Sequence, residues 1–200
     1  MEVYSSVDNI SQKNIPSSTL TIGTFDGMHL GHQHLIKGLI ERSEKNGNKS
    51  VVITFSPNPY TVINNEKTID YHLISENEKY KTLDTLGVDI LLEIQFDLEM
   101  AKISASDFLK LFIISPFNPQ DIIIGYDHHF GYKREGNSDF LIQNKKEYGY
   151  NLQAIDPFKK NGLTVSSSMI RKLIKENDIV NANSFLGRNY KISGNVIEGN

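Results

Sequence analysis

Five β-strand-like runs alternate along the chain with segments of helical periodicity. The runs lie at about 19–25, 50–55, 88–94, 121–125 and 151–155. Alternation of this kind is typical of a parallel sheet whose strands are joined by helices. The sequence therefore predicts an α/β protein with a Rossmann-like parallel sheet and helices on both of its faces.

Apolar spacing and capping residues locate the helices between these runs. The first helix is expected from about Gly31 to Asn46, because Gly47 is a good left-handed terminator. A second begins with a capping box at residues 75–78 and ends at Gly87. Later helices are expected after Ser104 or Ser106, near Ser138, after Ser168, and from Asp178 to Leu186.

Composition limits the classes of function. Hydrophobic residues make up 38% of the chain and charged residues 22%, which is ordinary for a globular protein. The net charge of −3 and the pI of about 6.1 give no electrostatic reason to expect binding to nucleic acid or to an acidic membrane. The lack of cysteine excludes disulfides, thiol catalysis and Cys-ligated zinc. No apolar run approaches the length of a membrane span, so a cytoplasmic enzyme is expected.

A glycine-rich stretch over residues 19–34 is the most informative motif for function. It reads T-L-T-I-G-T-F-D-G-M-H-L-G-H-Q-H, so a strand-like run ends in a tight turn just where the helical pattern begins. Gly23 and Gly27 permit backbone angles that a Cβ would forbid, and the missing side chain of Gly31 would let a ligand lie close to the helix start. Free N–H groups and the helix dipole make a polyphosphate the expected occupant.

Two histidines flank the last glycine of this motif. His29 and His32 are three residues apart, so both are expected to point from the first helical turn toward that phosphate. The alternative is that they only end the turn and cap the helix. A zinc site that also includes His34 is disfavoured, because the spacings cannot place all three rings on one helical face. Asp26 is expected to brace the turn by accepting backbone N–H bonds, with Mg²⁺ binding as the alternative.

A second polar helix start lies at residues 165–171, which read V-S-S-S-M-I-R. The simplest interpretation is an ordinary serine N-cap. The same residues can also hold phosphate, because Ser167 and Ser168 add hydroxyls to the helix N–H groups and Arg171 offers a planar fork.

Four segments together resemble one enzyme family. They are G-T-F-D-G-M-H-L-G-H (23–32), T-F-S-P-N-P (54–59), I-G-Y-D-H-H-F-G (124–131) and V-S-S-S-M-I-R (165–171). The chain is similar, over nearly its whole length, to the FMN adenylyltransferase (FAD synthetase) module of bacterial bifunctional riboflavin kinase/FAD synthetases, within the nucleotidylyltransferase superfamily. The resemblance implies the nucleotidylyltransferase fold, and transfer of AMP from ATP to FMN to give FAD and pyrophosphate, with Mg²⁺ accompanying ATP.

The resemblance also implies roles for individual residues. The catalytic residues would be His29, His32 and Arg171. The residues that bind ATP would be Gly23, Thr24, Phe25, Asp26, Gly27, His29, Gly31, His32, Ser167, Ser168 and Arg171. The residues that bind FMN would be Pro57, Asn58, Pro59, Gly125, Asp127, Phe130 and Gly131.

Some positions on the flavin side depart from the family pattern or admit two interpretations. Asn58 stands where many relatives have His, and His128 stands where Phe is common. Asp127 would orient the flavin ligand or brace its loop, and Phe130 is as compatible with a core position as with a stacking platform. The segment 57–71 lacks periodicity and is expected to be a long loop beside the site.

The end of the chain is expected to differ from the rest. Residues 1–186 would form the adenylyltransferase domain, and 187–200, with a strand from Tyr190 to Glu198, would be a linker or the truncated start of a riboflavin kinase domain. Kinase activity is therefore not expected. Two rival functions stay open: a nucleotidylyltransferase that uses another phosphate acceptor or CTP, and a non-catalytic nucleotide- or flavin-binding module.

Overall fold

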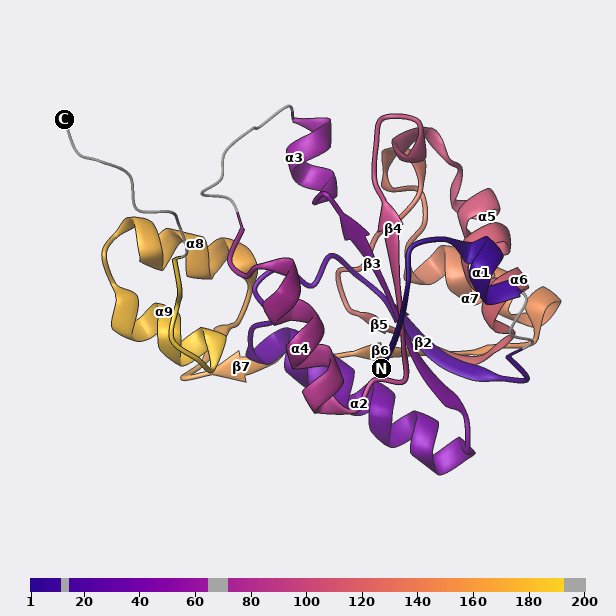
Figure 1. The fold of residues 1–200 in the computed structure, drawn as a ribbon, viewed down its shortest axis with the longest axis horizontal. Helices are drawn as coiled ribbons and strands as arrows, with labels where there is room; N and C mark the ends of the chain where they lie inside the picture. Colours follow the sequence, from indigo (N-terminus) through magenta and orange to yellow (C-terminus); the bar gives the residue numbers. More distant parts are fainter. Residues whose placement is uncertain (12–14, 65–71, 193–200) are drawn as a thin grey trace.

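A six-stranded parallel sheet forms the centre of the protein (Figure 1). The computed structural model describes residues 1–11, 15–64 and 72–192. The strand order is β1-β4-β3-β2-β5-β6, and every neighbouring pair is parallel. The strands are β1 (Glu2–Tyr4), β2 (Ser18–Ile22), β3 (Lys49–Ser56), β4 (Ile90–Gln95), β5 (Pro119–Gly125) and β6 (Asn151–Ile155). The predicted α/β class with a parallel sheet is confirmed.

Helices cover both faces of this sheet, as predicted. On one face lie α2 (Leu30–Asn46) and α4 (Glu76–Leu86). The opposite face is covered by α1 (Val7–Ser11), α5 (Ala105–Phe108), the π-helical turn η3 (Leu109–Ile114), α6 (Ser115–Phe117) and α7 (Ser138–Tyr148). Two short 3₁₀ turns, η2 (Met100–Lys102) and η4 (Tyr132–Arg134), complete this side.

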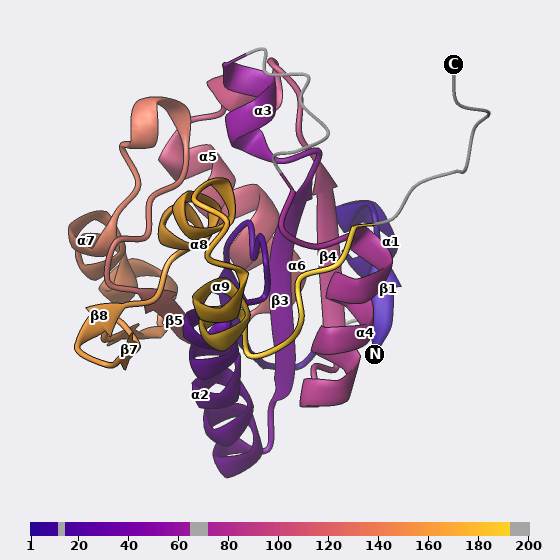
Figure 2. The ribbon, with the colours of Figure 1, turned by 90° about the vertical axis from the view of Figure 1, so that its left-hand side faces the viewer.

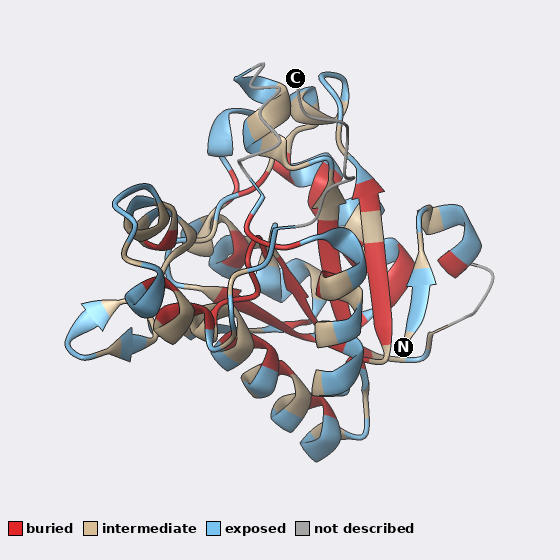
Figure 3. Ribbon diagram, turned by 60° about the vertical axis from the view of Figure 1, so that its left-hand side comes forward, coloured by how far each residue is buried: buried red, intermediate tan, exposed pale blue. Residues whose placement is uncertain are grey.

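Strand periodicity divides the apolar core into two layers. Ile122 and Ile124 of β5 pack with Phe108 and Phe117, whereas Ile123 between them packs with the α2 side chains. Successive side chains of a strand point to opposite faces, so a continuous apolar run fills both layers. Figure 3 shows the result, with buried residues gathered in the strands and exposed residues on the outer sides of the helices.

The C-terminal part forms a small unit beside the start of α2. It consists of the hairpin β7 (Lys159–Lys160) and β8 (Leu163–Thr164), followed by α8 (Ser167–Lys175) and α9 (Ile179–Leu186). Its apolar cluster includes Ile170, Phe185 and Leu186, together with Leu73 from the segment before α4. Figure 2 shows this unit in front of the sheet.

Two predicted segments differ from the structure or lie partly outside the described residues, and one strand was not predicted. The segment predicted as one long loop contains a short helix, α3 (Pro59–Ile63), while residues 65–71 lie outside the described residues. The strand predicted from Tyr190 is not present at residues 190–192, and its remainder lies outside the described part. β1 was not predicted, because a strand of three residues carries no detectable periodicity.

Candidate active site

The glycine turn follows β2 at the carboxyl edge of the sheet. The amide of Gly23 donates a hydrogen bond to the Ile53 carbonyl at 3.0 Å, which continues the pairing of β2 with β3. Phe25 then adopts a φ of 47° and is only 1% exposed, so the turn is anchored by an inward aromatic ring. Gly27 has a φ of 86°, and a Cβ there would lie 3.1 Å from Leu73. Both the positive φ and the lack of room for a Cβ therefore favour glycine at position 27, as predicted.

His29 and His32 lie together at the N-terminus of α2. Their rings stack with centroids 3.7 Å apart, so they share one side of the first helical turn as predicted. His29 is the N-cap, and its Nδ1 accepts a hydrogen bond from the His32 amide at 3.2 Å. The ring of Phe25 contacts His32 edge-on, with centroids 5.4 Å apart. The pair is thus held in one orientation before any ligand arrives.

Burial keeps both imidazoles neutral at pH 7. It lowers the pKa of His29 to about 4, and it lowers the pKa of His32 well below its usual value, with the neighbouring His29 adding to the effect. Since Nδ1 of a neutral His29 accepts a bond, its proton is on Nε2. His29 can therefore act as a hydrogen-bond donor through Nε2 without carrying charge.

Gly31 has a different role from the one predicted. A Cβ at Gly31 would lie 3.1 Å from the His29 ring and 3.2 Å from the Val165 carbonyl oxygen. The space beside this glycine is therefore occupied by the protein itself, where the sequence interpretation placed a ligand. Gly31 allows the His29 ring and the segment before α8 to approach the helix.

Asp26 joins the two predicted phosphate motifs. Its Oδ1 accepts a hydrogen bond from the Leu73 amide at 3.1 Å, which confirms the predicted bracing role. Its other carboxylate oxygen forms an ion pair with Arg171, and its carbonyl accepts a 2.8 Å hydrogen bond from the Ser167 hydroxyl. Asp26 and Ser167 are 141 residues apart in sequence. The start of α8 is thereby fixed beside the glycine turn.

The serines of the second motif divide their tasks. Ser166 is the N-cap of α8, and its hydroxyl accepts a hydrogen bond from the Met169 amide at 3.3 Å. Ser167 turns toward Asp26, while Ser168 is exposed. The N-cap interpretation and the phosphate interpretation are thus compatible, because different serines serve the cap and the turn.

The first flavin-side loop follows β3. Pro57 is exposed, and Asn58 is the N-cap of α3, where its Oδ1 accepts a hydrogen bond from the Tyr60 amide at 3.0 Å. Pro59 occupies the first helical position, which suits its fixed φ. The structure therefore assigns the Asn58 side chain a capping contact.

The second flavin-side loop follows β5. The carbonyl of Gly125 accepts a 3.1 Å hydrogen bond from the His128 amide, and Asp127 is exposed. Phe130 is 7% exposed and lies 5.5 Å from Phe108 between ring centroids, so the core interpretation of Phe130 is favoured. A Cβ at Gly131 would lie 2.7 Å from Ala105 backbone atoms, and its φ is 73°. Phe130 and Gly131 thus fix the base of the loop.

The three loops meet at one edge because of the sheet topology. β2 lies between β3 and β5, and all three strands are parallel, so the loops after Ile22, Ser56 and Gly125 leave the same edge. Ligands bind at this edge in open α/β sheets. A further link is the Thr54 hydroxyl, which donates to the Thr24 carbonyl at 3.2 Å. The ATP residues predicted within the glycine turn and the predicted FMN residues are therefore on adjacent loops.

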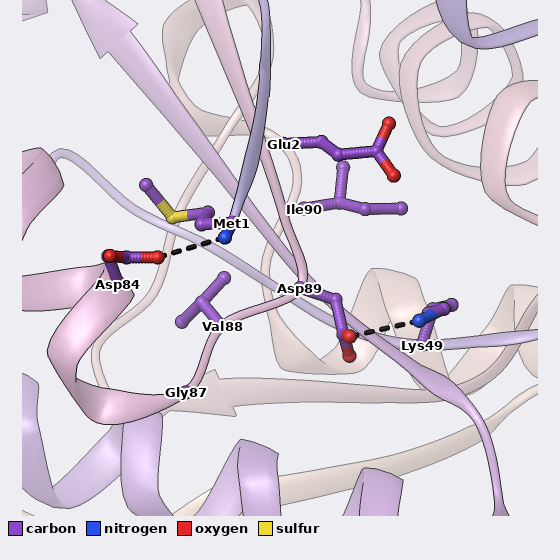
Figure 4. A pocket seen from close by; sticks show the side chains of 8 residues that line it. All are labelled: Met1, Glu2, Lys49, Asp84, Gly87, Val88, Asp89 and Ile90. Atoms are coloured by element: carbon purple, nitrogen blue, oxygen red, sulfur yellow. Dashed lines mark hydrogen bonds and ion pairs between the residues drawn. The ribbon is translucent and has the colours of Figure 1, made fainter.

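A cavity of about 380 Å³ lies at the opposite edge, near the amino ends of β1, β3 and β4 (Figure 4). Ion pairs of the Met1 amine with Asp84 at 2.8 Å and of Lys49 with Asp89 at 3.0 Å cross its lining. None of the residues predicted to act on ligands lines this cavity. It is separate from the site at the carboxyl edge.

Within residues 1–11, 15–64 and 72–192, no cluster of three or more His, Cys, Asp or Glu side chains could hold a metal ion. No helix among these residues is long and apolar enough to cross a membrane.

One contact residue was missed by sequence reasoning. Arg188 follows α9 and donates hydrogen bonds to the carbonyls of Gly27 and Leu73, at 3.2 and 2.8 Å. It lies outside every recognised motif, and only the fold brings it to the glycine turn.

Known proteins resemble the chain over most of its length. Residues 11–169 match the family described as FAD synthetase. A protein of Buchnera aphidicola subsp. Schizaphis graminum, named bifunctional riboflavin kinase/FMN adenylyltransferase, is 37% identical over 201 residues, which cover 100% of this chain and 64% of that protein. The protein of the same name from Escherichia coli K12 is 32% identical, with 100% and 63% covered. The chain thus spans less than two thirds of these curated relatives.

A solved structure has a similar fold. It is a crystal structure described as a macrolide-efflux protein from Streptococcus pneumoniae, with a TM-score of 0.76 and 26% identity. The match covers 94% of this chain and 60% of that one. The similarity supports the arrangement of sheet and helices described above.

Proposed function

We propose that this chain, which belongs to the FAD synthetase family, transfers the AMP group of ATP to FMN. The reaction forms FAD and releases pyrophosphate. Family membership rests on the match over residues 11–169. The names of the relatives support the substrate pair, because they include FMN adenylyltransferase.

The single observation that carries the proposal is the meeting of two helix N-termini at one glycine turn. α2 begins beside His29 and His32, and α8 is tied to the same turn through Ser167 and Arg171 at Asp26. Each helix start directs its first-turn N–H groups and a positive dipole end outward, which favours phosphate. A polyphosphate spanning both starts would place its reacting phosphorus next to the histidines.

The chemistry needs positioning and charge stabilisation. A phosphate oxygen of FMN forms a bond to the α-phosphorus of ATP, the bond from that phosphorus to the bridging oxygen of pyrophosphate breaks, and charge shifts to the leaving oxygens. His29 and His32 are neutral donors held in a buried pair, so they can stabilise this charge without reorganising. Arg171 would supply a planar cationic contact to the phosphates.

Magnesium enters this proposal as part of the MgATP substrate. The Asp26 carboxylate already bonds to the Leu73 amide and to Arg171. It therefore has little capacity left to ligate a metal, so the ion would be held chiefly by the nucleotide and water. Its expected contribution is to neutralise part of the phosphate charge.

The flavin would lie along the loops that follow β3 and β5. These loops border the glycine turn at the same sheet edge, with α3 at one side. Among the predicted flavin residues, Pro57 and Asp127 are exposed and available for contact. We place the reaction in the cytoplasm as part of the same proposal, because ATP is abundant there.

The test is formation of FAD from FMN and MgATP by the purified chain. FAD and pyrophosphate should appear in equal amounts, whereas CTP in place of ATP should give little product. Riboflavin in place of FMN tests the expectation that no kinase activity is present. Absence of FAD from the folded chain would refute the proposal, and equal use of CTP would favour the rival nucleotidylyltransferase.

A further inference from the structure

Arg188 bridges two segments that are distant from it in sequence. Its Nη2 donates hydrogen bonds to the Leu73 carbonyl at 2.8 Å and to the Gly27 carbonyl at 3.2 Å. The Leu73 amide in turn donates to the Asp26 carboxylate at 3.1 Å. The turn around residue 27 is therefore held to residue 73 from two directions, once through Asp26 and once through Arg188.

The residues just before Arg188 contact the same turn. Gln33 donates from Nε2 to the Met28 carbonyl at 2.8 Å and to the Leu186 carbonyl at 3.4 Å. A Cβ at Gly187 would lie 2.6 Å from Leu30 Cδ2, so the chain after α9 lies directly against the start of α2. Residues 186–188 thus form a clamp on the turn that carries His29.

The positive charge of Arg188 is not neutralised by the hydrogen bonds of this clamp. Its hydrogen bonds go to carbonyl oxygens, which accept a hydrogen bond but carry no negative charge that would neutralise a guanidinium. Glu78 acts on it electrostatically, but Glu78 also pairs with Lys191 at 2.7 Å. A cation that is only partly compensated beside the glycine turn favours an anionic ligand there.

We infer that Arg188 is a positioning residue for nucleotide binding, because it sets the backbone of the Gly27–His29 turn. The inference rests on the proposed function for its kinetic readout. It extends the functional unit beyond residue 186, where the sequence placed the end of the domain. Arg188 acts through the turn, so it is distinct from the residues that contact phosphate.

The kinetic signature separates positioning from simple stabilisation. A residue that only stabilises the fold would affect both substrates alike when it is removed. Loss of Arg188 should instead raise the KM for ATP by about tenfold, the scale of lost charged hydrogen bonds, while the KM for FMN changes by less than about twofold. Among the residues that the structure describes, no hydrogen bond joins the flavin loops after β3 and β5 to the clamp, which accounts for this difference.

The experiment compares Arg188→Ala and Arg188→Lys with Lys49→Ala as the control. Lys49 lies at the opposite edge of the sheet, and its side chain is 58% exposed in an ion pair with Asp89, so its removal should leave both KM values at the parental level. Arg188→Lys should give an intermediate KM for ATP. Amide hydrogen exchange at residues 27–32 should be faster in Arg188→Ala.

Several outcomes would overturn the inference. A parental KM for ATP in folded Arg188→Ala, or equal rises in both KM values, would do so. If Arg188→Ala does not fold, Arg188→Lys and Arg188→Gln are judged by the same criterion. ATP binding is also measured by calorimetry without FMN. If the parent makes no FAD, the proposed function fails, while unchanged ATP binding in the variants refutes the role of Arg188 separately.

Discussion

Two buried imidazoles make the protein sensitive to mildly acidic pH. Burial lowers the pKa of His29 from 6.5 to about 4. Burial, assisted by the neighbouring His129, lowers the pKa of His128 to about 4 as well. The two rings lie on different loops, with His29 at the start of α2 and His128 stacked on Phe130 at 5.7 Å between centroids. Both must be neutral in the folded protein.

The size of the effect follows from proton linkage. The unfolded chain binds these two protons more tightly than the folded protein does, so this stability is complete above pH 6.5 and is lost as the pH falls toward 4. From pH 7 to pH 5 each group should remove about 2 kcal/mol from the free energy of unfolding, or about 4 kcal/mol together. The lowered pKa of His32 acts in the same direction. The loss is a large share of the roughly 5–15 kcal/mol typical of a domain.

Urea unfolding followed by circular dichroism at pH 7 and pH 5 measures this loss. His128→Phe removes the titrating group on the loop after β5, so the loss of this variant between the two pH values should be smaller than that of the parent by about 2 kcal/mol. Tyr132→Phe is the control on the same loop, because Tyr132 is 42% exposed and its replacement leaves every histidine in place. The lowered pKa values of Glu78 and Asp89 affect stability only below their usual values of 4.5 and 3.8.

Two results would refute this reasoning. One is a parent protein with the same free energy of unfolding at pH 7 and pH 5. The other is a His128→Phe variant that loses as much stability as the parent. The second result would mean that His128 is solvated and can accept its proton within the folded state.

Three further predictions concern the site and the loop after β5. His32→Ala should lower kcat for FAD formation by about 10²–10³, the scale of one preorganised donor, and near-parental turnover of the folded variant would remove His32 from the mechanism. Arg171→Lys should weaken ATP binding, measured by calorimetry, because Lys cannot make bidentate phosphate contacts, and unchanged affinity would limit Arg171 to a structural role such as its ion pair with Asp26. Gly131→Ala should lower the free energy of unfolding in urea by about 1–3 kcal/mol more than Gly149→Ala, because both glycines have a positive φ but only Gly131 lies against Ala105. Equal losses in the two variants would contradict the contact argument.

The regular elements were predictable because their signals are local. The Ser75 cap and the left-handed Gly47 stand where the sequence placed them, at the start of α4 and the end of α2. β1 and the hairpin of β7 and β8 are too short to show periodicity, at three and two residues per strand. β1 exists through its pairing with β4, as in the register of Glu2 with Ile90. Such tertiary pairing is not encoded within three residues.

The site was predictable to the extent that its residues are consecutive. The His29 and His32 pair and the bracing by Asp26 follow from one motif, because helix geometry fixes neighbours three residues apart. The reason predicted for glycine at position 31 was wrong, because the space that a Cβ would fill there is bordered by the Val165 carbonyl and not left open for a ligand. The contact of Arg188 with Gly27 spans 161 residues, and no local pattern specifies it.

The arginines and histidines around the glycine turn are already held in place by contacts within the protein. Arg171 pairs with Asp26, Arg188 bonds to three carbonyls, and burial keeps His29 and His32 neutral. In the proposed reaction, a polyphosphate would therefore bind by exchanging partners with side chains that are already oriented. Ordered donors lose little conformational freedom on binding, and they need little reorganisation when charge develops on the phosphates. The same internal bonds explain why changes at Arg188, outside every recognised motif, should reach the nucleotide site.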